Sequence, residues 1–209
     1  MHNHFVSIVR GHECKTTAWS GGATTELLID PPGASYQERN FSWRLSVATV
    51  DDPESIFTAL PEVKRILLLL RGQVRLVHEG HYETALRPFT QDTFWGDWRT
   101  HCYGRATDFN LMTRTPYRGS VAPLFLTGQE PQRLTFDQDI TGETGILVLY
   151  VWQGGLTVSV DGRNYRLRAG DVCRIEAGQG ETPSVILVNR DRKPAKGVIT
   201  TIYKERKDG

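Results

Sequence analysis

The 209-residue sequence has almost no net charge and no hydrophobic run long enough to cross a membrane. Lysine and arginine together number 25, against 24 aspartate and glutamate residues, so the basic excess that marks nucleic-acid binding is missing. A membrane helix needs about 20 consecutive apolar residues, and no apolar stretch approaches that length. We therefore expect neither a nucleic-acid partner nor a membrane partner.

Cysteine is scarce, and the N-terminal segment does not resemble a secretory signal. The three cysteines, Cys14, Cys102 and Cys173, are an odd number without CxxC spacing, which favours reduced, buried thiols over disulfides. The opening MHNHFVSIVRGHE has no basic start followed by a long apolar segment, so we expect no signal peptide. Both observations predict a cytoplasmic protein.

The motifs of nucleophilic and cofactor chemistry are missing as well. The sequence contains no GxSxG elbow, no phosphate-binding loop and no dinucleotide fingerprint. His101 and Cys102 are neighbours in sequence, but neighbouring strand residues point to opposite faces, which argues against a paired base and nucleophile. No helical period of any length is present. We therefore predict no catalytic residue of these types and no cofactor.

The sequence does contain one hairpin pattern, and it occurs twice. Residues 66–89 begin with an aliphatic run, break at Gly72, alternate between apolar and polar residues, and turn at an acidic residue followed by glycine. Residues 149–171 repeat this order at an offset of 82 positions, which places Gly72 on Gly154. A whole hairpin repeated in register indicates two copies of one β unit.

The remaining sequence predicts many short strands between glycine and proline turns, the pattern of a β sandwich or barrel. We interpret residues 116–128 as a linker or junction, and residues 167–172 resemble a turn that is common in cupin barrels. Together with the duplication, this predicts an all-β fold of two cupin-like jelly-roll barrels, a bicupin, with little helix. Residues 1–116 would form the N-terminal cupin-like unit and residues 117–209 the C-terminal one, with strands exchanged between the two.

Metal-binding cupins carry a glycine, five residues, then His-x-His and a later glutamate, and this chain departs from that spacing. His78 follows Gly72 after five residues, but the next histidine is His81, across the turn, with Glu83 after it. Two hairpin neighbours placed in this way do not easily aim into a barrel together. The equivalent positions of the second copy offer no ligand. We predict no metal and expect both histidines to be solvated.

Three predicted strands carry polar residues where apolar ones would be expected. Arg44 lies between two serines on one strand face, Asp108 and Asn110 share a face of another strand, and Glu26 follows two threonines. Such a face either meets solvent or lines a polar cavity. In a cavity, Arg44 would hold a carboxylate through a bidentate fork, while Asp108 and Asn110 would bind polar groups. These residues alone leave both alternatives open.

The sequence resembles the HutD/Ves family over most of its length, most densely between residues 17 and 113. The segments that carry the resemblance are Trp19-Ser-Gly-Gly-Ala-Thr-Thr-Glu26, Trp43-Arg44-x-Ser46, the segment from Phe57 to Arg65 with its Leu-Pro-x-Val-Lys-Arg, and Thr107-Asp-Phe-Asn-Leu-Met112. The resemblance implies a bicupin fold and a cytoplasmic bacterial protein, in many cases encoded with histidine-degradation enzymes. Members have no firm catalytic assignment and are regarded as accessory or regulatory proteins that bind a small acid such as N-formylglutamate. The Ves branch is linked to stress responses instead.

Matched to this sequence residue by residue, the resemblance yields six candidate ligand-binding positions: Trp19, Glu26, Arg44, Arg65, Asp108 and Asn110. We expect first a non-catalytic binder of a small carboxylate metabolite like N-formylglutamate, accessory or regulatory in histidine utilisation or stress response. The alternative is a metal-independent cupin enzyme, an isomerase or hydrolase acting on a small acid or sugar, with Glu26 or Asp108 as the base. That enzyme needs a carboxylate with a raised pKa in an enclosed pocket.

A third hypothesis is a protein–protein module built on Trp95 and Trp98. These two tryptophans lie in one predicted loop, but such aromatic residues more often pack as lids than act as binding hot spots. We rank this hypothesis last. Free sheet edges are compatible with a homodimer.

Overall fold

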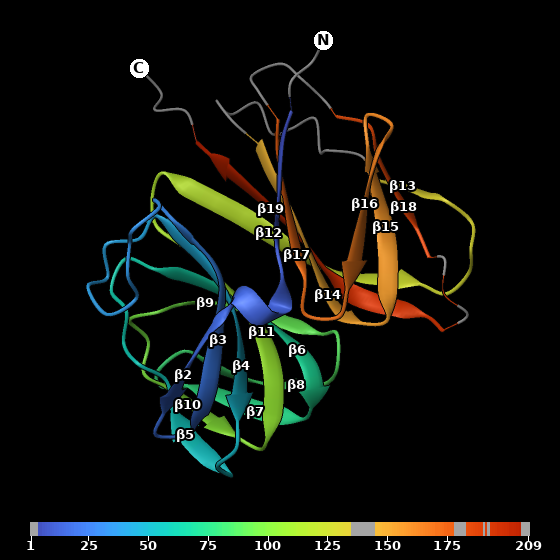
Figure 1. Cartoon of the computed structure of the whole chain (residues 1–209). Helices are drawn as coiled ribbons and strands as arrows, with labels where there is room; N and C mark the ends of the chain where they lie inside the picture. Colours follow the sequence, from blue (N-terminus) through green and yellow to red (C-terminus); the bar gives the residue numbers. More distant parts are fainter. Residues whose placement is uncertain (1–3, 135–144, 178–182, 190, 192, 206–209) are drawn as a thin grey trace. The chain divides into compact units, whose positions relative to one another are not determined.

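The computed structural model describes residues 4–134, 145–177, 183–189, 191 and 193–205, and it consists almost wholly of β strands (Figure 1). A single turn of 3-10 helix, η1 (Gly11–Glu13), interrupts them. The chain divides into two compact units. The first unit is Cys14–Tyr117, and the second unit is Arg118–Gly209 together with Met1–Glu13. In the described residues, no helix is long and apolar enough to span a membrane.

The first unit contains a six-stranded and a four-stranded sheet. In spatial order, the larger sheet consists of β2 (Lys15–Trp19), β3 (Gly22–Asp30), β4 (Trp43–Val50), β11 (Ala106–Thr113), β6 (Lys64–Gly72) and β9 (Gln91–Trp95), and the smaller sheet of β5 (Glu54–Ile56), β10 (Thr100–Tyr103), β7 (Val74–His78) and β8 (Tyr82–Leu86). Apolar side chains of both sheets pack into one core, because each alternating strand turns its apolar face toward the other sheet.

The second unit has a five-stranded and a four-stranded sheet. In spatial order they are β1 (Phe5–Val9), β17 (Val172–Ala177), β14 (Gly145–Gln153), β19 (Ala195–Lys204) and β12 (Tyr117–Leu126), and then β13 (Gln132–Leu134), β18 (Val185–Val188), β15 (Gly155–Val160) and β16 (Arg163–Arg168). Strand β1 pairs with β17, although the whole first unit follows β1 in the chain. A continuous apolar core again joins the two sheets.

The sheet orders of the two units match, which confirms the duplication. The order β9-β6-β11-β4 of the first unit corresponds to β17-β14-β19-β12 of the second, and β5-β10-β7-β8 corresponds to β13-β18-β15-β16. The first unit adds β3 and β2 beyond β4, and the second adds β1 beyond β17. The fold is therefore an all-β, duplicated, cupin-like jelly roll. Among the described residues, strand pairing leaves two separate sheets in each unit and does not close a barrel.

The paired glycines mark the point where the chain passes from one sheet to the other. Gly72 ends β6 with a φ of 87°, and Gly154 follows β14 with a φ of 77°. Both values lie in the left-handed region that favours glycine. At Gly72, a Cβ atom would also lie 2.2 Å from the carbonyl oxygen of Arg105. Glycine is thus required at this position for two independent reasons.

Of the two alternatives for residues 116–128, the linker is wrong, because most of this segment is strand β12, whereas a boundary between the two units does lie in this range, after Tyr117. Val121, Leu124 and Leu126 of this strand are buried, and β12 is the edge strand beside β19. Pro123 is exposed, as expected for a proline in an edge strand. The proline and the irregular spacing of the apolar residues hid the strand in the sequence.

The expectation that His78 is solvated is also wrong, since its side chain is only 1% exposed. Its Nδ1 lies 2.8 Å from Thr100 Oγ1 and its Nε2 lies 2.8 Å from Asp92 Oδ2. His78 is in phase with the buried residues of β7, so the alternation of the strand points its side chain inward. His81, beyond the turn, is exposed as expected and stacks on Trp98 with 3.8 Å between ring centroids.

Candidate functional site

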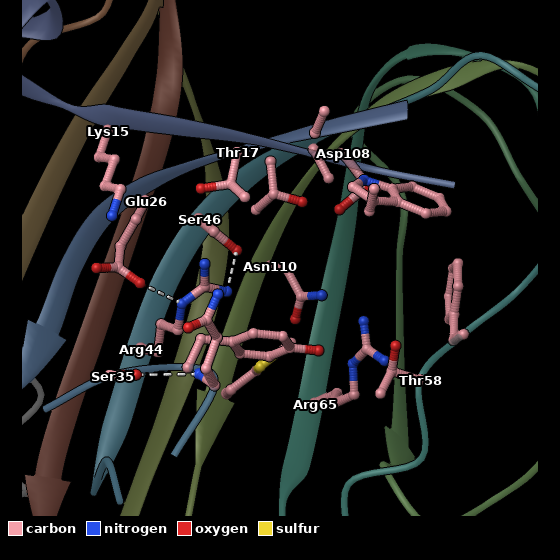
Figure 2. A pocket seen from close by; sticks show the side chains of 18 of the residues that line it. Lys15, Thr17, Glu26, Ser35, Arg44, Ser46, Thr58, Arg65, Asp108 and Asn110 are labelled. Carbon is pink, nitrogen blue, oxygen red and sulfur yellow. Dashed lines mark hydrogen bonds and ion pairs between the residues drawn. The ribbon is translucent and has the colours of Figure 1, made fainter. Parts of the chain in front are cut away.

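A cavity of about 390 Å³ lies within the first unit, against one face of the six-stranded sheet (Figure 2). Its lining comes from β2, β3, β4, β6 and β11, together with residues 34–37 and 56–58. The structure brings all six predicted residues to this one cavity: Trp19, Glu26, Arg44, Arg65, Asp108 and Asn110. That these residues bind a ligand stays a prediction. Their convergence from five strands follows from the strand register.

Cross-strand pairing arranges the polar side chains in rows, because directly opposed residues of neighbouring strands share a face of the sheet. The rows lie two residues apart along each strand, which is the spacing of side chains on one face. From β3 or β4 toward β6, the three rows are Thr24–Ala48–Asp108–Leu69, Glu26–Ser46–Asn110–Leu67 and Arg44–Met112–Arg65.

Arg44 is buried and already has partners on several sides. Its Nε donates to Glu26 Oε2 at 2.7 Å and its Nη1 donates to Ser46 Oγ at 3.2 Å. The Tyr36 ring covers the guanidinium, 4.6 Å from centroid to Cζ, in cation–π geometry. The Nε edge of Arg44 is therefore occupied by Glu26 and is not open to a ligand carboxylate. The bidentate fork that we expected from this arginine is therefore not available through its Nε edge.

Arg65 is as buried as Arg44, but its guanidinium contacts aromatic rings where that of Arg44 has hydrogen-bond partners. Its Cζ lies 4.9 Å from the Phe57 ring centroid and 5.2 Å from that of Phe94, so two aromatic rings hold the guanidinium in place. Its Nε has no hydrogen-bond partner within the described part of the chain. Burial lowers the pKa of Arg65, while Tyr36 and Asp108 oppose that effect. An arginine nevertheless keeps its charge in proteins. The cavity therefore contains a positive charge with an unused N–H group.

Asp108 is 4% exposed, and its Oδ1 has no hydrogen-bond partner among the residues that the structure describes. Burial raises the pKa of Asp108 to about 7, and nearby Arg65 offsets only part of that rise. Since the charged form of a buried carboxyl is disfavoured, Asp108 is a group that exchanges its proton near neutral pH.

Two further buried atoms on the cavity wall, Trp19 Nε1 and Asn110 Oδ1, also lack a partner among the described residues. An unsatisfied buried polar group costs about 1–3 kcal/mol, so proteins rarely collect several in one place. Together with Arg65 Nε and Asp108 Oδ1, these atoms give the cavity two N–H donors and two oxygen atoms for a polar guest. The arrangement can bind a small anion and, through Asp108, can also exchange a proton with it.

Sequence reasoning missed Tyr36, the aromatic cover of Arg44. It lies between β3 and β4, where Ser35 N donates to Asn40 Oδ1 at 2.8 Å, and its ring stacks on Phe41. No sequence signal marks such a loop residue, because its position depends on tertiary packing. Phe57, the ring beside Arg65, lies within a segment that carries the family resemblance, but its contact with the arginine depends on the folded arrangement.

Metal ligation has no support in the geometry of the side chains. In residues 4–134, 145–177, 183–189, 191 and 193–205, no three His, Cys, Asp or Glu side chains are grouped so that they could hold a metal ion. The histidines singled out in sequence illustrate why. His78 uses both ring nitrogens inside the core, and His81 lies on the surface. The absence of a metal from the functional protein stays a prediction.

Two jelly-roll units, one of which encloses a polar cavity, define a cupin-like protein of two units. Solved structures agree at the level of the fold. An oxalate decarboxylase mutant from Bacillus subtilis superposes with a TM-score of 0.66 at 9% identity, covering 98% of this chain and 78% of that one. At so low an identity the likeness shows the fold alone.

The chain belongs to the HutD family, whose sequence profile matches residues 11–190. A conserved protein of unknown function from Pseudomonas aeruginosa PAO1 has a TM-score of 0.79 at 26% identity, covering 97% of this chain and 100% of that one. HutD from Pseudomonas fluorescens SBW25, solved in a formate condition, has a TM-score of 0.71 at 20% identity over 97% and 100% of the two chains.

A relative from Pseudomonas putida is an uncharacterized 21.2 kDa protein in the hutC 3′ region. It is 29% identical over 112 residues, which are 51% of this chain and 57% of that relative. The alignment thus spans little more than half of the relative's length. Together with the family profile and the Pseudomonas fluorescens HutD structure, this relative supports the association of the family with histidine utilisation.

Proposed function

We propose that this protein is a non-catalytic, cytoplasmic binder of a small carboxylate metabolite such as N-formylglutamate, with an accessory or regulatory role in histidine utilisation. The observation that carries the proposal is Arg65, a buried guanidinium packed against two aromatic rings, with an Nε that has no partner in the described residues. A fixed planar guanidinium is well suited to a carboxylate, and the rings reduce the entropy lost on binding.

The rest of the cavity supports a ligand with both charged and neutral polar groups. Trp19 supplies an N–H donor, and Asn110 supplies an amide oxygen. A volume of about 390 Å³ lies at the lower end of the range for small-molecule pockets. A metabolite with a carboxylate and an amide would satisfy these groups, whereas a purely apolar guest would leave them buried without partners.

The proposal is tested by a thermal-shift titration of the chelator-treated protein with histidine, urocanate, formiminoglutamate, N-formylglutamate, glutamate and formate, with simple sugars as controls. A ligand at about 100 times its Kd stabilises the folded state by roughly 2.7 kcal/mol. We expect a shift for at least one acid, and loss of that shift in Arg65→Met. No shift for any acid with the wild-type protein would contradict the proposal.

Arg75→Met is the matched control for Arg65→Met. Arg75 lies in the same unit and pairs with Glu83 at 3.0 Å, but both side chains are at least half exposed. Such a surface pair contributes little to stability, and neither residue lines the cavity. The control should therefore keep the ligand-induced shift of the wild type. A loss of the shift in both variants would indicate a general effect of removing positive charge.

A metal-independent enzyme is the second candidate function, and the observation that favours it is Asp108. This carboxyl lies in a cavity, and burial raises its pKa to about 7, a value suited to a general base at neutral pH. Following each acid of the panel by ¹H NMR in the presence of the protein tests this candidate. A new product that Asp108→Asn does not form would favour the enzyme over the binder.

A further inference from the structure

The four charged side chains that β3, β4, β6 and β11 contribute to the cavity are already balanced before any ligand enters. Arg44 is paired with Glu26 at 2.7 Å, and Arg65 faces the interior together with Asp108, to which it is electrostatically coupled. With all four groups ionised, the net charge of this set is zero. A bound carboxylate would therefore add one uncompensated negative charge to a cavity of about 390 Å³.

Other groups near Asp108 do not remove this excess. Lys15 of β2 also lines the cavity, but it is exposed, so solvent screens its charge. On β10, Cys102 is buried and holds its proton, since burial raises the pKa of its thiol to about 12. On β9, Asp92 is held by His78 at 2.8 Å, and Tyr36 covers Arg44 from the loop before β4. The group in the cavity best able to change its charge is Asp108.

Two carboxylates that share one guanidinium in a buried site cannot both stay ionised at low cost, and one of them takes up a proton. We propose that the cavity binds its carboxylate together with one proton, which Asp108 takes from solvent so that its carboxyl group donates a hydrogen bond to the ligand. This inference rests on the proposed function. Atoms and charge balance, because one anion and one proton enter together and no bond within the ligand breaks.

The geometry provides for both partners of the anion. Arg65 of β6 and Asp108 of β11 line the same cavity from neighbouring strands. Arg65 Nε and Asp108 Oδ1 are both buried, and neither atom is hydrogen-bonded within the described part of the chain. A carboxylate between them can accept one hydrogen bond from the guanidinium and one from the protonated carboxyl. The ligand is thus a carboxylate that binds together with one proton, and that proton is located on Asp108.

Isothermal titration calorimetry with N-formyl-L-glutamate tests this inference directly. Titrations at pH 6.0, 7.0, 8.0 and 8.5, each in two buffers of different ionisation enthalpy, give the number of protons taken up on binding. We expect about one proton per site at pH 8 and nearly none at pH 6, with Kd rising about tenfold per pH unit above the pKa of Asp108. Asp108→Asn cannot ionise and should bind with a pH-independent affinity and no proton uptake.

The matched control is Glu83→Gln, which removes an exposed carboxylate of the same unit outside the cavity. It should keep the proton uptake of the wild type. If Asp108→Asn does not bind at all, ¹³C NMR of aspartate-labelled wild-type protein identifies the group. The Asp108 carboxyl signal is assigned as the one that is missing from the spectrum of Asp108→Asn. Its chemical shift must move to that of a protonated carboxyl group when N-formyl-L-glutamate is added at pH 8.

The possible failures can be told apart. Wild-type binding without proton uptake, or uptake that persists in Asp108→Asn, overturns this inference and leaves the proposed function intact. Absence of binding by the wild type to every acid of the panel at every pH overturns both.

Discussion

The two units share one sheet order but have different interiors. In the second unit, the space between the sheets is filled by a continuous apolar cluster, whereas the first unit combines its apolar core with a polar cavity. The sequence offset of 82 and the strand register identify equivalent positions. Arg65 corresponds to Leu147, Asp108 to Gly197 and Asn110 to Ile199.

The second unit therefore acts as an internal control for the first. Its topology forms with leucine, glycine and isoleucine at these positions, so the fold does not require charged or amide side chains there. Buried polar groups cost free energy unless they are paired. Because these polar groups are present in one unit and replaced in the other, they are not needed for the shared fold. They therefore belong to the site, and function depends on the site and not on the fold.

The largest loss of stability is expected when an arginine is placed in the second unit at the position equivalent to Arg65. Leu147 is buried in the apolar cluster, and Leu147→Arg would place a charge there without a prepared partner. An uncompensated buried charge costs about 3–5 kcal/mol. We expect loss of a cooperative unfolding transition for the second unit, measured by urea unfolding with circular dichroism.

The reciprocal variant, Arg65→Leu, is the control for Leu147→Arg. It replaces a buried charge with an apolar side chain, which is costly only where an oppositely charged partner is left ionised. At pH 6, where Asp108 is mostly protonated because its pKa is about 7, we expect a stability within about 1 kcal/mol of the wild type. Equal losses in both reciprocal variants would mean that the arginine of the first unit is structural.

The next largest loss of stability is expected when His78 of the first unit is replaced by its equivalent in the second unit. His78 corresponds to Val160, which is buried in the apolar cluster of the second unit. His78→Val removes the hydrogen bonds to Thr100 and Asp92. Asp92 Oδ1 keeps Tyr82 and the Thr93 amide as donors, but Oδ2 loses its donor, and we expect the two lost hydrogen bonds to cost about 3 kcal/mol together. Thermal denaturation measures this loss.

A double-mutant cycle separates the hydrogen-bonded pair from simple packing. Asp92→Asn should cost less in the His78→Val background than in the wild type, because the partner is already missing. Additive effects of the two substitutions would show that His78 acts through its volume alone.

Asp108 makes the stability of the first unit depend on pH. Burial raises its pKa from 3.8 to about 7, so the folded state binds more protons than the unfolded state between these values, and stability falls as pH rises. From pH 5 to pH 8.5, this group should reduce the stability of the wild type by about 2–3 kcal/mol. Asp108→Asn should lack this loss, so the difference in Tm between variant and wild type should grow with pH.

The matched control for this pH series is Glu83→Gln, because Glu83 is exposed. Its Tm should follow that of the wild type at every pH. A constant difference in Tm between Asp108→Asn and the wild type would mean that Asp108 keeps the same charge throughout, contrary to the pKa that its burial implies.

The sequence predicted the duplicated fold because glycine breaks and strand alternation are local features that recur in register. It also selected the polar strand faces, since Arg44, Asp108 and Asn110 interrupt apolar alternation on strands that are buried on both sides. The sequence could not show which of the two arginines, Arg44 or Arg65, is already paired with a carboxylate of the protein. The contact of Arg44 with Glu26 depends on pairing between β3 and β4, and no single strand contains that information.

Other failures have the same physical origin. Tyr36 reaches the cavity from a loop, where no period indicates the direction of a side chain. The buried state of His78 was indicated by its phase with Leu76, but the polarity of histidine and the nearby turn favoured solvent. Strand β12 was missed because Pro123 and uneven apolar spacing are features of an edge strand as much as of a linker.

The smallest losses of stability are expected at the hairpin turns, where the two units should behave alike. Gly80 and Gly162 occupy the equivalent hairpin turns with φ values of 75° and 82°, and a Cβ at either would meet nothing within 4 Å. Only backbone strain opposes Gly80→Ala and Gly162→Ala, at about 1–2 kcal/mol each. Urea unfolding should give equal losses for the two variants, since the turn belongs to the shared fold and not to the interior that differs. A loss confined to one variant would show that the two hairpins, although repeated in sequence, do not contribute equally to the units that contain them.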